Sequence, residues 1–145
     1  MQILDAACGR GYLLNKILEA NPEALCAGVD IAVPPVNSAP FKIIQADITA
    51  LPFGDKSFDV VICTHALEHI RKPRKALLEL IRVTRKRLII VVPRQREYRY
   101  TVDLHVNFFP YMYSFKRFIG IKDALYLDLK GDLLCCVDFR ATLIN

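Results

Sequence analysis

Residues 3–11, which read Ile3-Leu4-Asp5-Ala6-Ala7-Cys8-Gly9-Arg10-Gly11, decide the fold of this chain. A short apolar run ends in an acid, a loop of small residues follows, and a helix-forming stretch comes next. This order predicts a strand whose carboxyl end delivers a ligand to a flexible turn and to the free N–H groups of a helix N-terminus. A dinucleotide-binding turn requires a third glycine three residues after Gly11, but that position is Leu14. A generic turn and a loop for another ligand both stay open.

Strand and helix signals alternate along the first two thirds of the chain. Apolar runs predict strands over residues 2–5, 25–30, 42–45, 59–63 and 88–92, and apolar stripes predict helices over 12–20 and 73–84. A short helix over 114–119 and a hairpin of strands 124–128 and 133–139 follow. Strands with helices between them, and then a hairpin, predict an α/β sheet that is mostly parallel with an antiparallel edge.

Composition predicts a single globular domain over residues 1–145. The chain is 53% hydrophobic and 24% charged, which allows a sizeable core. Its apolar runs are only strand length, so we expect no membrane span, and the first strand starts too early for a signal peptide. The 5 cysteines are scattered without a Cys-x-x-Cys pair. We therefore expect reduced thiols, a cytoplasmic location and no metal site.

The net charge of +5 comes from a basic excess between positions 71 and 99. Such a segment attracts an acidic substrate, a nucleic acid or a membrane surface. It is equally typical of a solvated face that binds nothing.

Polar residues close four of the expected parallel strands. They are Asp5, Asp30, Asp47 and the pair Thr64-His65. Ligands of open α/β sheets bind where such strands end. Asp30 follows the glycine turn by about 20 residues, the spacing at which an acid accepts both ribose hydroxyls of a nucleotide. Enzymes that bind NAD share this acid, so Asp30 alone does not identify the ligand.

The segment from Asp47 to Val61 identifies the ligand more closely. It contains an acid, then Leu51-Pro52-Phe53, a turn, and Phe58-Asp59-Val60-Val61. Leu67-Glu68-His69 and a helix that starts with proline continue the pattern. In this order the motifs resemble the small-molecule type (type 11-like) of class I S-adenosylmethionine-dependent methyltransferases, over about residues 2–93. The resemblance implies a Rossmann-like sandwich with a seven-stranded sheet and an antiparallel C-terminal hairpin.

The resemblance also implies a role for each residue at the strand ends. Asp5 is expected to orient the methionine part of S-adenosylmethionine, and the turn of Ala7, Cys8, Gly9 and Gly11 to pass beneath it. Asp30 is expected to bind the ribose hydroxyls, Ile31 to pack on the adenine, Asp47 to accept its amino group, and Ile48 to offer a backbone N–H. Thr64 and His65 are expected near the reactive methyl group. Alternatively, the acids only cap turns and Ile31 is ordinary core.

Methyl transfer from a sulfonium requires a nucleophile held in line with the methyl–sulfur bond. It requires a general base only when the nucleophile arrives protonated. His65 is the first candidate base and His105 the second, but either is equally a pocket contact. Glu68-His69 is expected to fix the following loop and helix, with substrate contact as the alternative.

The loop 94–109 is basic and aromatic, with Arg94, Arg96, Tyr98, Arg99 and Tyr100. Such a loop suits a phosphate or a nucleotide-bearing substrate, a lid, or a self-association surface.

Three departures from the family pattern have structural consequences. Ala7 replaces a glycine, which is tolerable if its backbone keeps a negative φ. Residues 84–87 replace the usual Lys-Pro-Gly-Gly turn, so we expect a different turn there. No N-terminal helical cap precedes the first strand, so we expect a truncation, an open minimal enzyme, or a pocket completed by a partner subunit or a second copy. The alternative functions are a relative that binds the cofactor without turnover and, less well supported, an NAD-binding domain.

Overall fold

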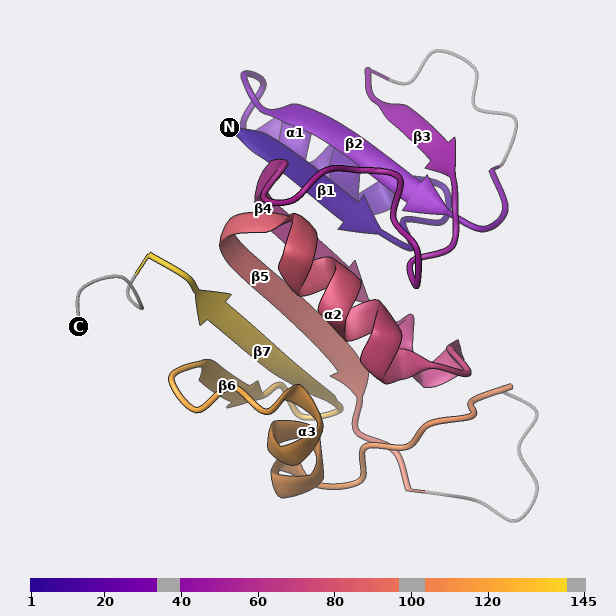
Figure 1. Ribbon diagram of the computed structural model, residues 1–145, viewed down its shortest axis with the longest axis vertical. Coiled ribbons are helices and arrows are strands. Elements are labelled where there is room, and N and C mark those ends of the chain that lie inside the picture. The colour runs from indigo at the N-terminus through magenta and orange to yellow at the C-terminus, as the bar shows by residue number, and fades with distance from the viewer. Residues whose placement is uncertain (34–39, 97–103, 141–145) are drawn as a thin grey trace.

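Seven strands form one sheet in the computed structural model, which describes residues 1–33, 40–96 and 104–140 (Figure 1). The strands are β1 (Gln2–Ala6), β2 (Leu25–Asp30), β3 (Lys42–Gln45), β4 (Phe58–Thr64), β5 (Thr84–Pro93), β6 (Leu125–Asp128) and β7 (Asp132–Asp138). Their order is β3-β2-β1-β4-β5-β7-β6. Strands β1 to β5 pair in parallel, and β7 is antiparallel to both of its neighbours. The predicted α/β fold with an antiparallel hairpin is confirmed.

Helices cover both faces of the sheet. They are α1 (Tyr12–Ala20), the 3₁₀ turn η1 (Leu67–His69), α2 (Pro73–Val83) and α3 (Met112–Ile119). In Figure 1, α2 lies in front of the sheet and α1 behind it. Helix α2 starts with Pro73, where a missing N–H costs nothing, and buries Ala76, Leu77, Leu80 and Val83 along one stripe. Among the described residues, no helix has the length and apolar character needed to cross a membrane.

The expected turn at residues 84–87 does not form. Helix α2 ends at Val83, and the chain enters β5 directly at Thr84, whose backbone is extended (φ −81°, ψ 129°). The Thr84 hydroxyl donates a hydrogen bond of 2.6 Å to the carbonyl of Leu80 and so satisfies one of the free carbonyls of the last helical turn. No glycine is needed because no residue at this junction takes a positive φ.

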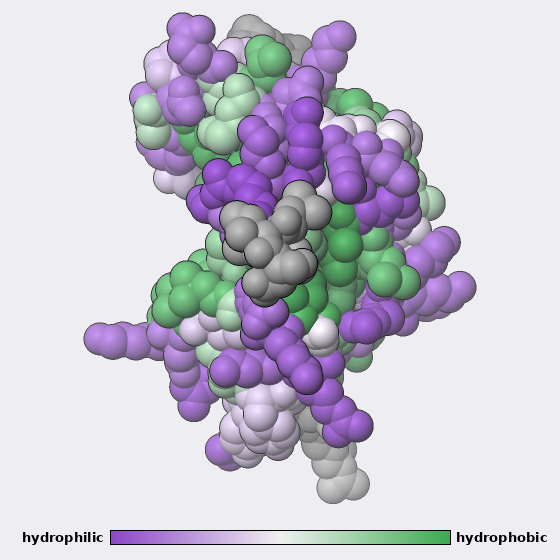
Figure 2. Space-filling view, turned by 60° about the vertical axis from the view of Figure 1, so that its left-hand side comes forward, coloured by the Kyte–Doolittle hydropathy of each residue, from purple (hydrophilic) through white to green (hydrophobic). Residues whose placement is uncertain are grey.

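Five of the ten described cations between positions 71 and 99 pair with acids within the fold. The pairs are Arg82 with Glu79 and Asp55, Arg85 and Lys86 with Asp59, Arg87 with Asp138, and Arg94 with Asp128. Figure 2 shows hydrophilic side chains spread over much of one face, around a band of hydrophobic ones. This pairing supports the solvated face, and a nucleic-acid partner stays a prediction.

Candidate active site

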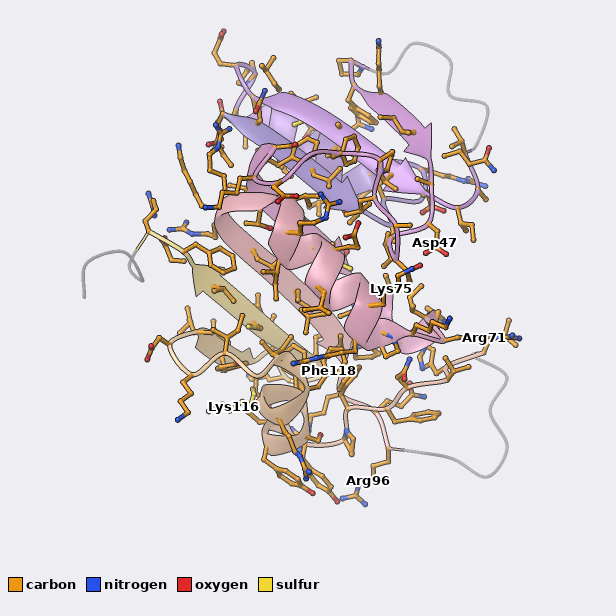
Figure 3. All side chains as sticks on the ribbon, in the orientation of Figure 1. Asp47, Arg71, Lys75, Arg96, Lys116 and Phe118 are labelled. Atoms are coloured by element: carbon orange, nitrogen blue, oxygen red, sulfur yellow. The ribbon has the colours of Figure 1, made fainter. Side chains whose placement is uncertain are left out.

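The carboxyl ends of the parallel strands bring the expected site residues to one edge of the sheet. In Figure 3, Asp47, Lys75 and Arg71 lie along the side toward which the arrow of β3 points. The backbone N–H of Ala46 donates to the carbonyl of Asp30 at 3.0 Å, so the ends of β3 and β2 are joined. Parallel pairing of β1 with both β2 and β4 places Asp5 between Gly28 and Ile62. The sheet thus collects residues that are far apart in the sequence.

Asp5 is a buried carboxylate in the centre of the sheet. Its side chain is 2% exposed, and its Oδ1 atom has no hydrogen-bond partner among the described residues. Burial, reinforced by the negative charge of Asp30, raises the pKa of Asp5 to about 7. A buried acceptor without a donor costs free energy unless a ligand satisfies it. Asp5 therefore suits a cationic ligand group with N–H donors.

Asp30 is held by the loop that follows β1. Its Oδ2 atom accepts a hydrogen bond of 2.7 Å from the N–H of Gly9, and its Oδ1 atom accepts one of 3.1 Å from the N–H of Ala32. Each carboxylate oxygen can accept a second hydrogen bond. The carboxylate is therefore fixed in orientation and still able to accept two hydroxyl groups.

The loop after β1 folds back over the end of β2. The N–H groups of Ala7 and Cys8 both donate to the carbonyl of Val29, at 2.7 and 3.0 Å. The loop needs left-handed backbone at Ala7 (φ 66°), Gly9 (φ 53°) and Gly11 (φ 74°). The expectation that Ala7 keeps a negative φ is wrong, because the double contact with Val29 holds Ala7 in the left-handed region. An alanine there is strained by its Cβ atom.

Replacing Ala7 with glycine is expected to raise the free energy of unfolding by about 1 kcal/mol, because glycine takes a positive φ without a Cβ clash. Urea unfolding followed by circular dichroism measures the change. Ala6→Gly is the matched control: Ala6 is a buried residue of β1 without a positive φ, so that change is expected to destabilise the fold. A loss of stability in Ala7→Gly as large as in Ala6→Gly would contradict the strain at position 7.

The Cys8 side chain is half-buried and packs beneath this loop. Burial, with the charges of Asp5 and Asp30, raises the pKa of the Cys8 thiol to about 12. A thiol protonated at neutral pH is a poor nucleophile. Cys8 therefore contributes packing and its backbone to the site.

A cavity of about 400 Å³ lies beside the ends of β2 and β3. It includes two of the expected residues: Ile31, which is 72% exposed for an apolar side chain, and Asp47, whose Oδ1 accepts the N–H of Thr49 at 2.7 Å. The side chain of Ile48 is buried, so only its backbone can reach a ligand. The residues that line the cavity are Ile31, Asp47, Thr49, His69, Ile70, Arg71, Lys72 and Lys75. Asp5 and Asp30 are not among them.

The end of β4 places His65 between two carboxylates. Thr64 closes the strand and pairs with Val91, and His65 follows with φ 50°, an uncommon conformation for a non-glycine residue that is found often at functional sites. The Nδ1 atom of His65 lies 3.7 Å from Glu68 Oε1, and its Nε2 atom lies 3.5 Å from Asp132 Oδ2. Asp132 could not be predicted as a site residue, because only the antiparallel pairing of β7 brings it to this edge.

His105 also lies near Glu68, with one ligand atom of each residue within 4.8 Å of the other. Its ring packs edge-on against that of His69, with centroids 4.6 Å apart, and its Nδ1 contacts Gln95 Oε1. Glu68 is buried, which raises its pKa, while His69, His65 and His105 oppose that shift. The buried carboxylate of Glu68 therefore lies near both candidate bases, His65 and His105. The sequence pair Glu68-His69 indicated only part of this arrangement.

The basic loop contributes less to this edge than the sequence predicted. Arg94 pairs with Asp128 at 2.7 Å, and the Arg96 guanidinium lies 5.7 Å from the centroid of the Tyr111 ring. Tyr98, Arg99 and Tyr100 lie outside the described residues. The binding of a substrate by this loop stays a prediction.

Comparison with known proteins agrees with this geometry. A family model described as "Methyltransferase domain" matches residues 4–92, more than half of the chain. A demethylmenaquinone methyltransferase of Renibacterium salmoninarum is 32% identical over 87 residues, which are 58% of this chain and 37% of that protein. The chain thus spans well under half the length of this relative.

Solved structures share the fold at low sequence identity. A Burkholderia thailandensis 1,6-didemethyltoxoflavin-N1-methyltransferase with bound 1,6-didemethyltoxoflavin and S-adenosylhomocysteine superposes with a TM-score of 0.74 at 18% identity, covering 94% of this chain and 70% of that one. The [4+2]-cyclase SpnF superposes with a TM-score of 0.69 at 19% identity, covering 88% and 52%. From the family match and the sheet order together, the chain belongs to the methyltransferase domain family and has the class I, S-adenosylmethionine-dependent methyltransferase fold.

Proposed function

We propose that this chain binds S-adenosylmethionine at the carboxyl edge of its sheet and transfers the methyl group to a small-molecule acceptor. The observation that carries the proposal is the pair of acids on adjacent strands: Asp5, buried with an unpartnered oxygen, and Asp30, held by the N–H groups of Gly9 and Ala32. S-adenosylmethionine, when bound, supplies a methyl group already activated by its sulfonium. The protein has to bind, orient and exclude water.

Each residue of the loop and of the strand ends has a binding role in this proposal. Asp5 accepts N–H groups of the methionine ammonium, and Asp30 accepts the ribose hydroxyls. Ile31 offers an exposed apolar surface to the adenine, and Asp47 accepts its amino group. The remaining residues, Ala7, Cys8, Gly9, Gly11, Ile48 and Thr64, contribute backbone or close packing. The fit rests on the unpartnered Asp5 oxygen, the open acceptor positions of Asp30 and the exposure of Ile31.

His65 is the better candidate for a general base, and His105 is the second. A carboxylate faces each ring nitrogen of His65, at 3.7 and 3.5 Å, so an acceptor lies near either nitrogen. His65 takes up the acceptor's proton only if the acceptor arrives protonated, and is otherwise a pocket contact. His105 contacts Gln95 and His69 instead.

Titration of S-adenosylhomocysteine by isothermal calorimetry between pH 6 and 7.5 tests the proposal. We expect specific 1:1 binding whose affinity rises by up to about tenfold over this range. Asp5 has a raised pKa of about 7, so it is largely protonated at pH 6, and only its ionised form pairs with an ammonium group. Binding at pH 6 is therefore expected to release a proton into the buffer.

Asp5→Asn is the matched control for this titration. The variant is expected to bind more weakly at pH 7.5 and to lose the pH dependence. It is also expected to fold, because a raised pKa in the folded state means that ionised Asp5 costs stability as the pH rises from about 4 to 7. Absence of heat with S-adenosylhomocysteine, or binding of NADH in its place, would reject the proposed function.

The second candidate is a protein of this fold that binds the cofactor, or a partner, without methyl transfer. The structural similarity to a [4+2]-cyclase shows that this fold alone does not fix the reaction. Transfer of label from methyl-labelled S-adenosylmethionine to a pool of small metabolites distinguishes the two. The proposal also includes one domain over residues 1–145, a cytoplasmic location suggested by the free thiols, and a second copy or a partner subunit that covers the carboxyl edge of the sheet.

A further inference from the structure

One side-chain cluster beside the proposed site has no part in cofactor binding. It consists of Glu68 and His69 in η1 and His105 in the segment before α3. One ligand atom from each residue, a ring nitrogen or a carboxylate oxygen, lies within 4.8 Å of the other two. We propose that Glu68, His69 and His105 bind one divalent transition-metal ion of the zinc class.

The backbone holds the two parts of this cluster together. The N–H groups of Val106 and Asn107 both donate to the carbonyl of Glu68, at 2.7 and 3.0 Å. The Asn107 side-chain amide donates to the carbonyls of Leu67 and Ile70, at 2.9 and 2.7 Å. The segment that carries His105 is thus fixed on the turn that carries Glu68 and His69. A pre-formed set of ligands loses little entropy when it binds an ion.

Each imidazole has an acceptor oxygen beside its Nδ1 atom. The Nδ1 atom of His69 faces the carbonyl oxygen of Leu104 at 3.4 Å, and that of His105 faces the amide oxygen of Gln95. Because both oxygens only accept, the tautomer with its proton on Nδ1 suits these contacts and leaves the lone pair of Nε2 for an ion. An imidazole that donates Nδ1–H to an oxygen and offers Nε2 to an ion is the usual outer arrangement of a metal site.

Glu68 supplies a carboxylate that the rest of the fold leaves incompletely satisfied. Its side chain is 1% exposed, and its Oε2 atom has no hydrogen-bond partner among the described residues. Its other oxygen lies 3.7 Å from His65. A buried oxygen without a donor is costly, and a bound cation would remove that cost.

The donor set selects the class of ion. Two imidazoles and one carboxylate suit Zn²⁺, Co²⁺ or Ni²⁺, whereas Mg²⁺ and Ca²⁺ prefer oxygen ligands. Around a tetrahedral Zn²⁺ ion, ligand atoms lie about 3.4 Å apart, so these side chains would move inward by small rotations. Three protein ligands leave a fourth position open. His69 also lines the 400 Å³ cavity, so the open position adjoins the space beside Ile31 and Asp47.

Titration of the purified chain with Co²⁺, followed by visible absorption and calorimetry, tests the site. We expect saturable binding of one ion with the absorption bands of a four- or five-coordinate nitrogen–oxygen site. Zn²⁺ is expected to displace Co²⁺, and Mg²⁺ is expected not to. His69→Gln and His105→Gln are each expected to lower the affinity by at least about tenfold. His65→Gln is the matched control, since it removes the one histidine outside the cluster and is expected to retain binding.

Several results would overturn the proposal. These are the absence of saturable binding, an equal loss of affinity in His65→Gln and His69→Gln, or the intense near-ultraviolet absorption of thiolate ligands from the free cysteines. Displacement of Co²⁺ by Mg²⁺ at similar concentrations would also reject it. Thermal unfolding in EDTA verifies that each variant folds without metal. The site does not depend on the proposed methyl transfer, so either proposal can fail without the other.

Discussion

Asp30→Ala is expected to weaken the binding of S-adenosylhomocysteine by about 1–3 kcal/mol, or roughly 5- to 150-fold. The variant loses two acceptor oxygens at the end of β2. It also loses the anchors for the N–H groups of Gly9 and Ala32, at 2.7 and 3.1 Å, so the loop beneath the ligand becomes less well fixed. Isothermal calorimetry at pH 7.5 gives the affinity, and thermal unfolding without ligand gives the separate effect on the fold.

Asp128→Ala is the matched control for Asp30→Ala. Asp128 is also the last residue of a strand, but that strand is β6, and Asp128 pairs with Arg94. Its loss is expected to leave the affinity unchanged, because the strand lies at the opposite edge of the sheet from β3. Asp30→Asn keeps the size of the side chain and one acceptor oxygen, so an intermediate loss is expected. Unchanged affinity in a folded Asp30→Ala protein would remove Asp30 from the site.

The strands of the sheet could be predicted from the sequence because each one has a local pattern that also indicates its place in the fold. Continuous apolar runs such as residues 59–63 are typical of strands buried on both faces, and the acids at their ends mark the carboxyl edge. The predicted boundaries of β2 and β3 agree with the structure, while β5 begins four residues earlier than its apolar run. Arg85, Lys86 and Arg87 are charged and pair with acids, and this charge concealed the start of the strand.

The site residues could be predicted where they lie at the carboxyl end of a strand, as Asp5, Asp30 and Asp47 do. The contact of His65 with Asp132 depends on the antiparallel pairing of β7 with β5. The contact of His105 with Gln95 depends on how the segment before α3 lies beside the residues after β5, and no local pattern encodes either arrangement. The positive φ of Ala7 also escaped prediction, because the carbonyl of Val29 imposes it from a different strand.

Gly28→Ala is expected to destabilise the fold by about 1–3 kcal/mol and to weaken S-adenosylhomocysteine binding with it. A Cβ atom at position 28 would lie 2.5 Å from the Sγ of Cys8, 3.2 Å from its Cβ and 3.1 Å from a methyl group of Leu14. The first distance is far below van der Waals contact, so the Cys8 side chain must rotate or the loop that carries it must shift. Urea unfolding measures the stability, and calorimetry measures the binding. Gly54→Ala is the matched control, because its nearest neighbour would be 3.6 Å away.

A double variant distinguishes this clash from a general intolerance of β2. Cys8→Ala removes the sulfur that the new Cβ would meet, so Cys8→Ala/Gly28→Ala is expected to be more stable than the sum of the single changes predicts, by about 1 kcal/mol or more. The rescue is expected to be incomplete because Leu14 and the Cβ at position 8 stay close. If the changes in stability of the two single variants simply add in the double variant, contact with the Cys8 sulfur is not what makes Gly28→Ala destabilising. Recovery of both stability and affinity would show that one sulfur–glycine contact between β2 and the loop positions the backbone on which the proposed cofactor rests.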